Sequence, residues 1–283
     1  MKIPFEIDLT GKTAVVTGGG GVLCRCFAKA IAACGAKVAV LDLNKDAADT
    51  VAAEIGADGG TAVGVGANVL DKASLESAKK TVNNLFGKVD ILINGAGGNN
   101  PKGTTTKDYY DPADETAEGI KTFFDLDPAG VEFVFNLNFL GTLLPTQVFA
   151  HDLIEQKDAC IINISSMNAF TPLTRIPAYS GAKAAVSNFT QWLAVHFSKS
   201  DIRVNAIAPG FFLTQQNRGL LLDENGEYTA RSKKILSQTP MDRFGEPEEL
   251  LGTLLMLLSH DASSFINGVI IPIDGGFSAY SGV

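Results

Sequence analysis

The chain has 283 residues, of which 46% are hydrophobic and 19% are charged, and its formal net charge at pH 7 is −8. This length suits one α/β domain, and the apolar content is high enough to bury a sheet beneath helices on both faces, which excludes a disordered chain. The acidic balance, without any basic run, argues against a nucleic acid or an anionic membrane surface as a partner.

The cysteines and the start of the chain indicate a cytoplasmic protein. Cys24, Cys26 and Cys34 fall in one expected helix, Cys160 lies far along the chain, and no CxxC spacing occurs. We therefore predict free thiols in a reducing compartment and no metal site. Residues 1–11 lack the basic start and apolar core of a signal peptide, and charges interrupt the longest apolar stretches, so no membrane span is predicted.

Short apolar runs alternate along the chain with segments of helical periodicity. The predicted strands are 13–16, 37–41, 61–65, 89–93, 160–164, 203–207 and 269–273, and the predicted helices are 23–34, 45–55, 72–86, 131–153, 178–197 and 247–258. Each crossover between parallel strands needs a helix to return the chain. The alternation therefore predicts a doubly wound, seven-stranded parallel sheet with helices on both faces, in a single domain.

Two stretches interrupt this alternation. Residues 98–130 are polar and contain three prolines, which predicts a loop with limited helix. Residues 211–243 follow Pro209-Gly210 and mix aromatic, basic and polar side chains. Both stretches leave the carboxyl ends of strands, where open α/β sheets bind ligands, so we predict that they are substrate loops.

A glycine-rich turn, Thr17-Gly18-Gly19-Gly20-Gly21, separates the first predicted strand from the first predicted helix. Glycines let the backbone approach a pyrophosphate, and the helix N-terminus beyond them supplies free N–H groups and a partial positive charge. This context indicates a dinucleotide site, although a tight strand-to-helix connection explains the glycines equally well at this point.

Asp42 ends the second predicted strand, where an acidic side chain can accept hydrogen bonds from both adenosine ribose hydroxyls. Its charge would repel a 2′-phosphate, and Leu43-Asn44 offers no arginine to compensate. NAD(H) is therefore preferred over NADP(H), unless Asp42 is only a solvated carboxylate at a strand end. Asn68-Val69 and Asn94-Gly95-Ala96-Gly97, after the third and fourth strands, either border the adenine and the sugar or form plain turns.

Tyr179 and Lys183 stand four residues apart at the start of predicted helix 178–197, and Ser166 lies thirteen positions before Tyr179. Side chains at i and i+4 are neighbours on one helix face, so the Lys183 ammonium would favour the phenolate and lower the pKa of Tyr179 from about 10. Such a tyrosine can act as a general acid and base. The alternative is a half-buried aromatic side chain at a helix start.

Several motifs occur in the order and at the spacing of one known family. They are the glycine turn, Asn94-Gly95-Ala96-Gly97, Asn138 with Gly141, Ser166, Tyr179 with Lys183, and Pro209-Gly210 with Thr214. On these motifs nearly the whole chain resembles the short-chain dehydrogenase/reductase family, which implies a Rossmann-type fold. Segments 123–127, 166–173 and 276–280 are similar to the branch described as D-mannonate oxidoreductase or fructuronate reductase. The family pattern TGxxxGxG has glycine where this chain has Val22 and Cys24, so the turn geometry is expected to differ slightly.

The resemblance implies a role for each residue. Tyr179 would donate a proton to a carbonyl oxygen in reduction and accept one from the alcohol in oxidation, while Lys183 would lower its pKa and bind the nicotinamide ribose. Ser166 would hold the carbonyl oxygen, and Asn138 would bind a water that passes protons to Lys183. The implied cofactor-binding residues are Thr17, Gly18, Gly20, Gly21, Val22, Leu23, Asp42, Leu43, Asn68, Val69, Asn94, Gly95, Ala96, Gly97, Tyr179, Lys183, Pro209, Gly210, Phe212 and Thr214.

A sugar acid would need a cation or N–H donors for its carboxylate and polar groups for its hydroxyls. The loop residues beside the expected site that offer these groups are Asn99, Asn100, Lys102, Asn168, Arg175 and Arg218. Arg175, four residues before Tyr179, is favoured for the carboxylate, although a solvated surface arginine explains it equally well. Segments 211–213 and 220–222 could instead line an apolar pocket for an acyl or steroid substrate.

The favoured activity is the NAD(H)-dependent interconversion of a ketone and a secondary alcohol on a small-molecule sugar acid, by resemblance D-fructuronate and D-mannonate. A gluconate, sorbose or other polyol dehydrogenase is the alternative enzyme. A non-catalytic NAD-sensing protein is the alternative of another class. Predicted helices 131–153 and 178–197 are more apolar than one sheet face requires, and the corresponding family helices pack between subunits, so a homo-oligomer, tetramer or dimer, is expected.

Overall fold

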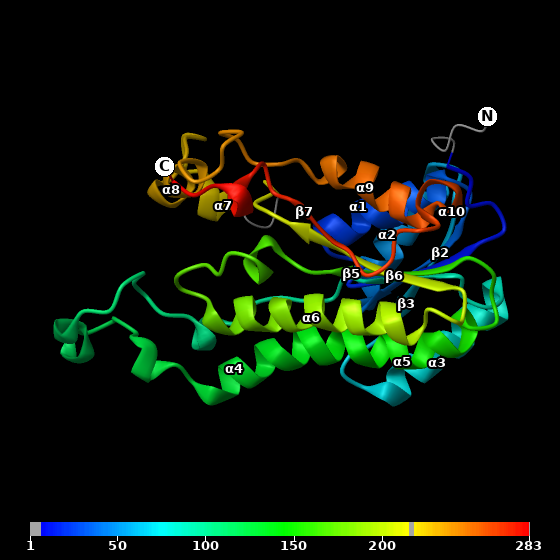
Figure 1. Ribbon diagram of the computed structural model, residues 1–283, viewed down its shortest axis with the longest axis horizontal. Coiled ribbons are helices and arrows are strands. Elements are labelled where there is room, and N and C mark those ends of the chain that lie inside the picture. Colours follow the sequence, from blue (N-terminus) through cyan, green and yellow to red (C-terminus); the bar gives the residue numbers. More distant parts are fainter. Residues whose placement is uncertain (1–6, 215–217, 283) are drawn as a thin grey trace.

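A computed structural model describes residues 7–214 and 218–282 and confirms the predicted doubly wound, single-domain architecture (Figure 1). Seven strands form one parallel sheet in the order β3-β2-β1-β4-β5-β6-β7. The strands are β1 (Thr13–Thr17), β2 (Lys37–Asp42), β3 (Thr61–Gly66), β4 (Ile91–Asn94), β5 (Ala159–Ile164), β6 (Ile202–Pro209) and β7 (Ile270–Ile273). The strand order reverses between β1 and β4, and this is where open α/β sheets form a ligand crevice.

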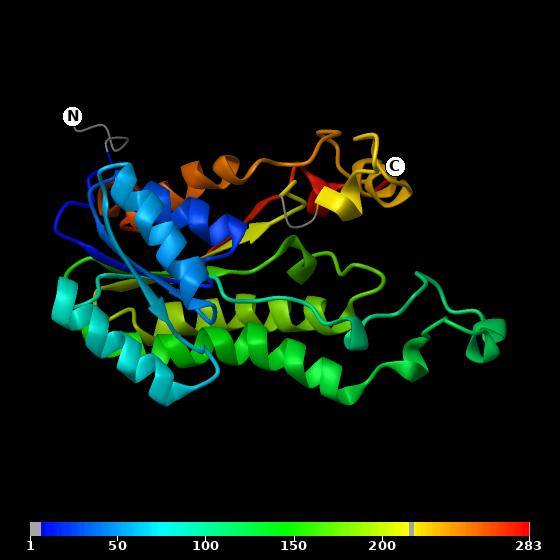
Figure 2. The same ribbon diagram turned by 180° about the vertical axis from the view of Figure 1, so that it is seen from behind.

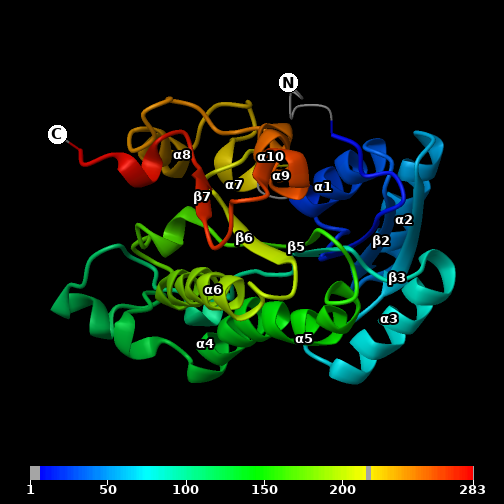
Figure 3. The same ribbon diagram turned by 45° about the vertical axis from the view of Figure 1, so that its right-hand side comes forward.

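Helices cover both faces of the sheet, as the rotated view makes plain (Figure 3). The main helices are α1 (Val22–Ala33), α2 (Lys45–Ala57), α3 (Lys72–Phe86), α4 (Pro128–Phe135), α5 (Gly141–Leu153), α6 (Pro177–His196) and α9 (Leu251–Leu258). Successive side chains of each strand point to opposite faces of the sheet, so the strands contribute to two hydrophobic cores, one on each face. Val16 and Val40 are buried with α1, α2 and α9, whereas Val15 and Leu41 are buried with α3, α5 and α6.

The helix starts differ in a way that matters for ligand binding. α2 begins after Asn44, whose side chain accepts hydrogen bonds from Asp46 N and Ala47 N, and α3 begins after Asp71, whose carboxylate accepts one from Ala73 N. α1 begins after Gly21 and has no side-chain cap. The first-turn N–H groups of α1 therefore remain available to an anion.

The predicted helix 131–153 is interrupted. α4 and α5 are joined by a single π-helical turn, η4 (Asn136–Leu140), and Pro145 lies inside α5. Proline lacks the N–H that would reach Gly141, and hydrophobic periodicity does not reveal a π turn. By length and composition this rod, Pro128–Leu153, could cross a membrane, but 44% of its most apolar window is buried inside the molecule. Its apolar character thus has a reason within the fold.

The two predicted substrate loops have different structures. After β4 the chain forms only short 3-10 turns, η1 (Pro101–Gly103), η2 (Pro112–Thr116) and η3 (Phe123–Asp125), within a segment that projects from the body (Figure 2). After β6, the loop contains two short helices, α7 (Arg218–Leu221) and α8 (Ala230–Leu236), which the sequence reading did not anticipate. The chain closes with η6 (Pro247–Leu250), α10 (His260–Ser263), β7 and η7 (Phe277–Ala279).

Candidate functional site

The carboxyl ends of β1 and β4 are joined through one threonine. Thr17 and Asn94 are register partners, and Thr17 Oγ1 accepts hydrogen bonds from Gly95 N at 3.1 Å and Ala96 N at 3.3 Å. Thr17 is fully buried, whereas Gly95 and Ala96 are half-buried. The two hydrogen bonds fix the glycine turn after β1 against the loop after β4, at the carboxyl ends of the two strands.

The glycine turn is shaped for close approach. Gly18 has a φ of +64°, and a Cβ added there would lie 2.9 Å from the Ala96 backbone. A Cβ on Gly20 would lie 2.8 Å from Ala47 Cβ and 3.0 Å from a carboxylate oxygen of Asp42. With the uncapped N-terminus of α1 directly beyond, this cradle fits a dinucleotide pyrophosphate, which Val22 and Leu23 would meet through their backbone N–H groups.

Asp42 is fixed at the end of β2 by two backbone donors. Gly20 N donates to Oδ2 at 3.0 Å, and Asn44 N donates to Oδ1 at 2.9 Å. Each carboxylate oxygen retains a lone pair, so the side chain can still accept hydrogen bonds from two ribose hydroxyls. Leu43, beside it, is 77% exposed and offers an apolar surface at the same edge.

Cys24 replaces a family glycine and has a structural role. A Cβ built on Gly95 would lie 2.1 Å from Cys24 Sγ, so the thiol fills the space above that glycine. The contact between α1 and the loop needs a small residue on one side, and here that residue is Gly95 on the loop rather than a glycine on α1. Burial raises the pKa of Cys24 to about 12, which makes the thiol a poor nucleophile.

Two predicted cofactor residues use their side chains for the fold itself. Asn68 Oδ1 accepts a hydrogen bond from Leu70 N at 3.0 Å. This is the geometry of a plain turn, which was the alternative to a cofactor contact for this residue. Asn94 is buried, and its Nδ2 donates to Thr146 Oγ1 and to Asn163 Oδ1, each at 2.9 Å. Asn94 Oδ1 is buried and has no hydrogen-bond partner.

Tyr179 and Lys183 lie on one face of α6, as their spacing predicts, with Lys183 Nζ 5.7 Å from the centre of the Tyr179 ring. Nζ also donates to Ile164 O at 2.7 Å, which ties the ammonium to the end of β5. Burial lowers the pKa of Lys183 to about 8, against a smaller raising effect from Cys24.

The expected lowering of the Tyr179 pKa is wrong for this structure. Burial raises the pKa of the phenol, because the phenolate loses hydration, and a side-chain hydrogen bond with Ser166 acts in the opposite direction but is the weaker effect. Ser166 is buried just beyond β5, and its Oγ accepts a hydrogen bond from Asn168 N at 3.3 Å. Tyrosine, serine and lysine therefore meet at the carboxyl end of β5.

Asn138 joins the π turn to the loop after β4. Its Nδ2 donates to Gly98 O at 2.7 Å, and its Oδ1 accepts from Gly98 N at 3.2 Å. A Cβ on Gly97 would lie 2.7 Å from Asn138 Oδ1 and 3.2 Å from Lys183 Nζ. Glycine at position 97 thus lets Asn138 Oδ1 and Lys183 Nζ approach the loop closely. The water relay through Asn138 remains a prediction.

The end of β6 packs closely against the segment after β7. Gly210 N donates to Ile273 O at 2.9 Å, and a Cβ on Gly210 would lie 2.5 Å from the Asp274 backbone. Phe212 is buried against Gly245, so it supports the loop rather than facing solvent. Thr214 is half-buried at the end of the described segment.

The predicted substrate residues fall into different surroundings. Arg175 Nε donates to Asp108 Oδ1 at 2.7 Å, so its guanidinium is already engaged. Asn168 is 4% exposed, and its buried Oδ1 has no hydrogen-bond partner. Asn99 Nδ2 donates to Thr104 Oγ1 at 3.1 Å. The side chain of Arg218 lies outside the described part of the structure.

Sequence reasoning missed Asp108. Its carboxylate pairs with Arg175 and Lys234, and it accepts a hydrogen bond from Thr174 Oγ1 at 2.9 Å. These partners hold the pKa of Asp108 well below its usual range. Asp108 thereby links the loop after β4, the segment before α6 and helix α8. No short sequence motif signals such a long-range pairing.

Comparison with known proteins places this geometry in context. A model of the short chain dehydrogenase family matches residues 12–225. The chain is 58% identical over 283 residues to a protein from Haemophilus influenzae described as an uncharacterized oxidoreductase, covering 100% of this chain and 99% of that protein. It is 52% identical over 281 residues to "Uncharacterized oxidoreductase UxuB" of Bacillus subtilis, covering 99% of this chain and 100% of that protein.

One solved structure matches over the full length. It is a crystal structure from Haemophilus influenza described as a "putative D-Mannonate oxidoreductase" with bound NAD. It is 58% identical to this chain, covers 100% of both chains and superimposes with a TM-score of 0.94.

Proposed function

Because the chain belongs to the short-chain dehydrogenase family, an oxidoreductase family acting on CH–OH groups, we propose that it interconverts a ketone and a secondary alcohol on a sugar acid, with D-fructuronate and D-mannonate as the pair. The observation that carries this proposal is the meeting of Ser166, Tyr179 and Lys183 at the carboxyl end of β5. A phenol beside a buried ammonium is suited to proton exchange with an alcohol oxygen.

NAD(H) rather than NADP(H) is the proposed cofactor. A similar structure contains bound NAD, and the cradle of Gly18–Gly21 with the open N-terminus of α1 fits a pyrophosphate. The fixed carboxylate of Asp42 supports the preference, because it can accept bonds from two ribose hydroxyls and would repel a 2′-phosphate. When bound, this cofactor supplies or accepts the hydride.

The side chains of the protein transfer the proton and bind the reacting oxygen. In reduction, the hydroxyl of Tyr179 donates its proton to the carbonyl oxygen as that oxygen gains negative charge, and in oxidation the phenolate accepts the proton of the alcohol. Ser166 Oγ–H donates a hydrogen bond to the same oxygen. The Lys183 ammonium, fixed by its bond to Ile164 O, stabilises the phenolate that forms during reduction.

Support for a sugar-acid substrate comes from the name of the similar structure and from two polar groups. Asn168 keeps a buried Oδ1 without a partner, which can accept a bond from a substrate hydroxyl. Arg175 uses Nε for Asp108, and the other nitrogens of its guanidinium can donate to a carboxylate. The loops 98–130 and 211–243, linked through Asp108 and Lys234, would then cover the substrate.

The substrate assignment is tested by following NADH absorbance with purified protein. D-fructuronate is compared with a panel of ketoses and acyl ketones at matched concentrations. We expect D-fructuronate to be reduced with the highest kcat/KM. Turnover of no uronate at all would overturn the substrate assignment, and faster turnover of an acyl ketone would show that the apolar segments 211–213 and 220–222 define the pocket instead.

We further propose that the protein acts in the cytoplasm as a homo-oligomer. Free cysteines, two of them buried, suit a reducing compartment. Apolar side chains on α4 and α6 remain exposed, among them Phe133 at 44%, Trp192 at 55% and Val195 at 76%. An apolar surface of this kind on two adjacent helices is typical of a subunit interface.

A further inference from the structure

The segment between β4 and α4 carries an unusual surface. Residues 104–127, called the arm here, project from the body beyond the N-terminus of α4 (Figure 2). The arm exposes four large aromatic side chains: Tyr109 at 82%, Tyr110 at 55%, Phe123 at 68% and Phe124 at 69%. Phe124 makes edge contacts with Tyr110 and Phe123, so three of the four form one cluster.

The arm is acidic as well as aromatic. It contains seven acidic and two basic side chains, a net charge of −5. Asp114 is buried and paired with Lys107, whereas Asp111, Glu115, Glu118 and Asp125 are exposed. The surface that covers this arm should therefore be basic and should present flat or aliphatic groups to the aromatic rings.

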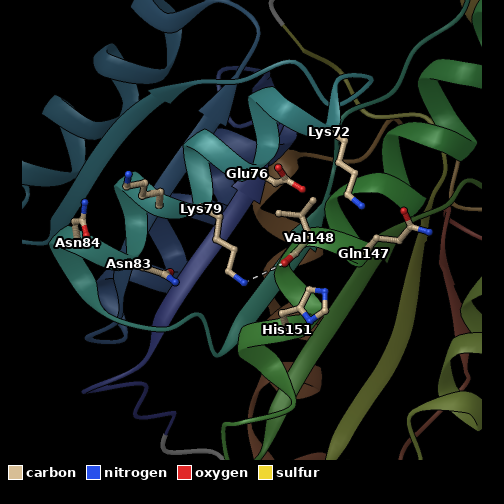
Figure 4. Close-up of a pocket in the computed structure, with 9 residues that line it drawn as sticks. Lys72, Glu76, Lys79, Asn83, Asn84, Gln147, Val148 and His151 are labelled. Atoms are coloured by element: carbon tan, nitrogen blue, oxygen red, sulfur yellow. Dashed lines mark hydrogen bonds between the residues drawn. The ribbon is translucent and has the colours of Figure 1, made fainter.

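A basic groove with these properties lies at the opposite end of the molecule. It runs between α3 and α5 and has a volume of about 350 Å³ (Figure 4). Lys72, Glu76 and Lys80 line one side at one-turn spacing on α3, while Gln147 and His151 line the other side on α5. None of the residues assigned to the candidate site above lines this groove.

Only some of the lysine side chains that line this groove form ion pairs within the chain. Lys79 Nζ forms an ion pair with Asp152 at 2.8 Å and donates a hydrogen bond to Val148 O at 3.3 Å. Lys72 and Lys80 are exposed, and neither makes an ion pair with any residue of the described segments 7–214 and 218–282. Their ammonium groups and methylene stems are suited to acidic and aromatic side chains.

The arm and the groove occupy opposite ends of one rod. The arm adjoins the first residue of the rod Pro128–Leu153, and the groove lies beside its last turns, at Gln147 and His151. At 1.5 Å per residue these two places are roughly 30 Å apart. If two copies pack their rods antiparallel about a two-fold axis, the arm of each lies beside the groove of the other. The apolar rod residue Leu140 and the α6 residues Trp192 and Val195 are exposed between the two ends and would form the seam.

We propose that the arm of one protomer docks into the α3–α5 groove of a second copy, with its acidic side chains against Lys72 and Lys80. The contact is isologous, so it forms twice in each dimer. It rests on the homo-oligomer proposed above and adds the residues that hold it together. It also gives the arm a fixed position beside the mouth of the site, to which its base is tied by Asp108.

Charge reversal in both directions tests this contact by sedimentation velocity across a protein concentration series. Lys72→Glu/Lys80→Glu should raise the dissociation constant of the dimer by about tenfold or more, and Glu115→Lys/Glu118→Lys should do the same. Combining the four substitutions should bring back most of the lost affinity. Lys37→Glu, an exposed charge reversal outside the groove, is the matched control and should leave assembly unchanged.

Each alternative outcome overturns the proposal. If the wild-type protein is monomeric, both the proposed arm contact and the proposed homo-oligomer are wrong. A wild-type oligomer that the groove variants leave intact, or that the combined variant does not recover, removes the arm contact alone. Variants of the arm that change the KM for a ketone substrate but not assembly would instead show that the arm closes over its own site. The substrate test above is independent of all these results.

Discussion

At the residue scale, the proposed proton transfer depends on the charge of Lys183. Its ammonium is buried, with 4% exposure, and is held by Ile164 O beside the ring of Tyr179. Burial lowers the pKa of Lys183 to about 8, while burial raises the pKa of Tyr179. The phenol thus stays protonated through the neutral range and can donate, and the lysine changes charge near neutrality.

The rate of reduction should fall as the pH rises through about 8. Above that pH Lys183 loses its proton, so the phenolate that forms during reduction is no longer stabilised. The measurement is kcat/KM for ketone reduction between pH 6 and about pH 10. A profile that stays flat across this range would contradict the role given to the ammonium.

A loss of stability caused by the deprotonation of Lys183 would not explain a fall in the rate of reduction at high pH. The pKa of Lys183 is depressed from 10.5 to about 8 on folding, so between these values the unfolded chain binds more protons than the folded chain. Stability contributed by Lys183 is therefore present above pH 10.5 and is lost as the pH falls through about 8. A thermal melt at each pH separates a loss of activity from a loss of structure.

Cofactor choice should depend on Asp42. Its carboxylate is fixed by Gly20 N and Asn44 N, and replacing it removes the charge that repels a 2′-phosphate. Asp42→Ser should raise the ratio of kcat/KM with NADPH to kcat/KM with NADH by about tenfold or more. The control is Asp58→Ser, a change of the same charge at the far end of α2. An unchanged ratio would show that another group selects the cofactor.

At the element scale, the contact between α1 and the loop after β4 accounts for the altered glycine pattern. Cys24 on the helix occupies the space above Gly95 on the loop. The sequence pattern indicated that the turn would differ, but it could not show that a loop glycine makes room for the thiol. The interruption of Pro128–Leu153 by a π turn was also invisible, because a π turn shifts the helical phase by one residue without a distinct residue signature.

Gly95→Ala should destabilise the fold by about 1–3 kcal/mol through overpacking against Cys24. In Gly95→Ala/Cys24→Gly the sulfur is removed, so part of that stability should return, although a Cβ at position 95 would still lie 2.9 Å from Thr17 O. Urea unfolding of the two variants and of Cys24→Gly alone gives the coupling free energy. Additive effects would mean that the two residues are not in the tight contact described.

At the scale of the whole molecule, the parallel sheet with helices on both faces could be predicted, because apolar strands and crossover helices are local patterns that few topologies satisfy. The grouping of Ser166 with Tyr179 and Lys183 was predicted from the family spacing of these residues, and β5 and α6 are in contact in the fold. The pairing of Asp108 with Arg175 and Lys234 joins positions up to 126 residues apart, and the direction of the Tyr179 pKa depends on burial. Neither is encoded in a local pattern.

The proton transfer assigned to Tyr179 is tested most directly by Tyr179→Phe, which removes one oxygen and keeps the ring. NADH consumption with D-fructuronate is measured for the wild type and the variant, and NADH affinity is measured for both by fluorescence titration. We expect turnover to fall by about 10²–10⁴-fold while NADH affinity stays nearly unchanged. Retention of wild-type turnover by the variant would contradict the account.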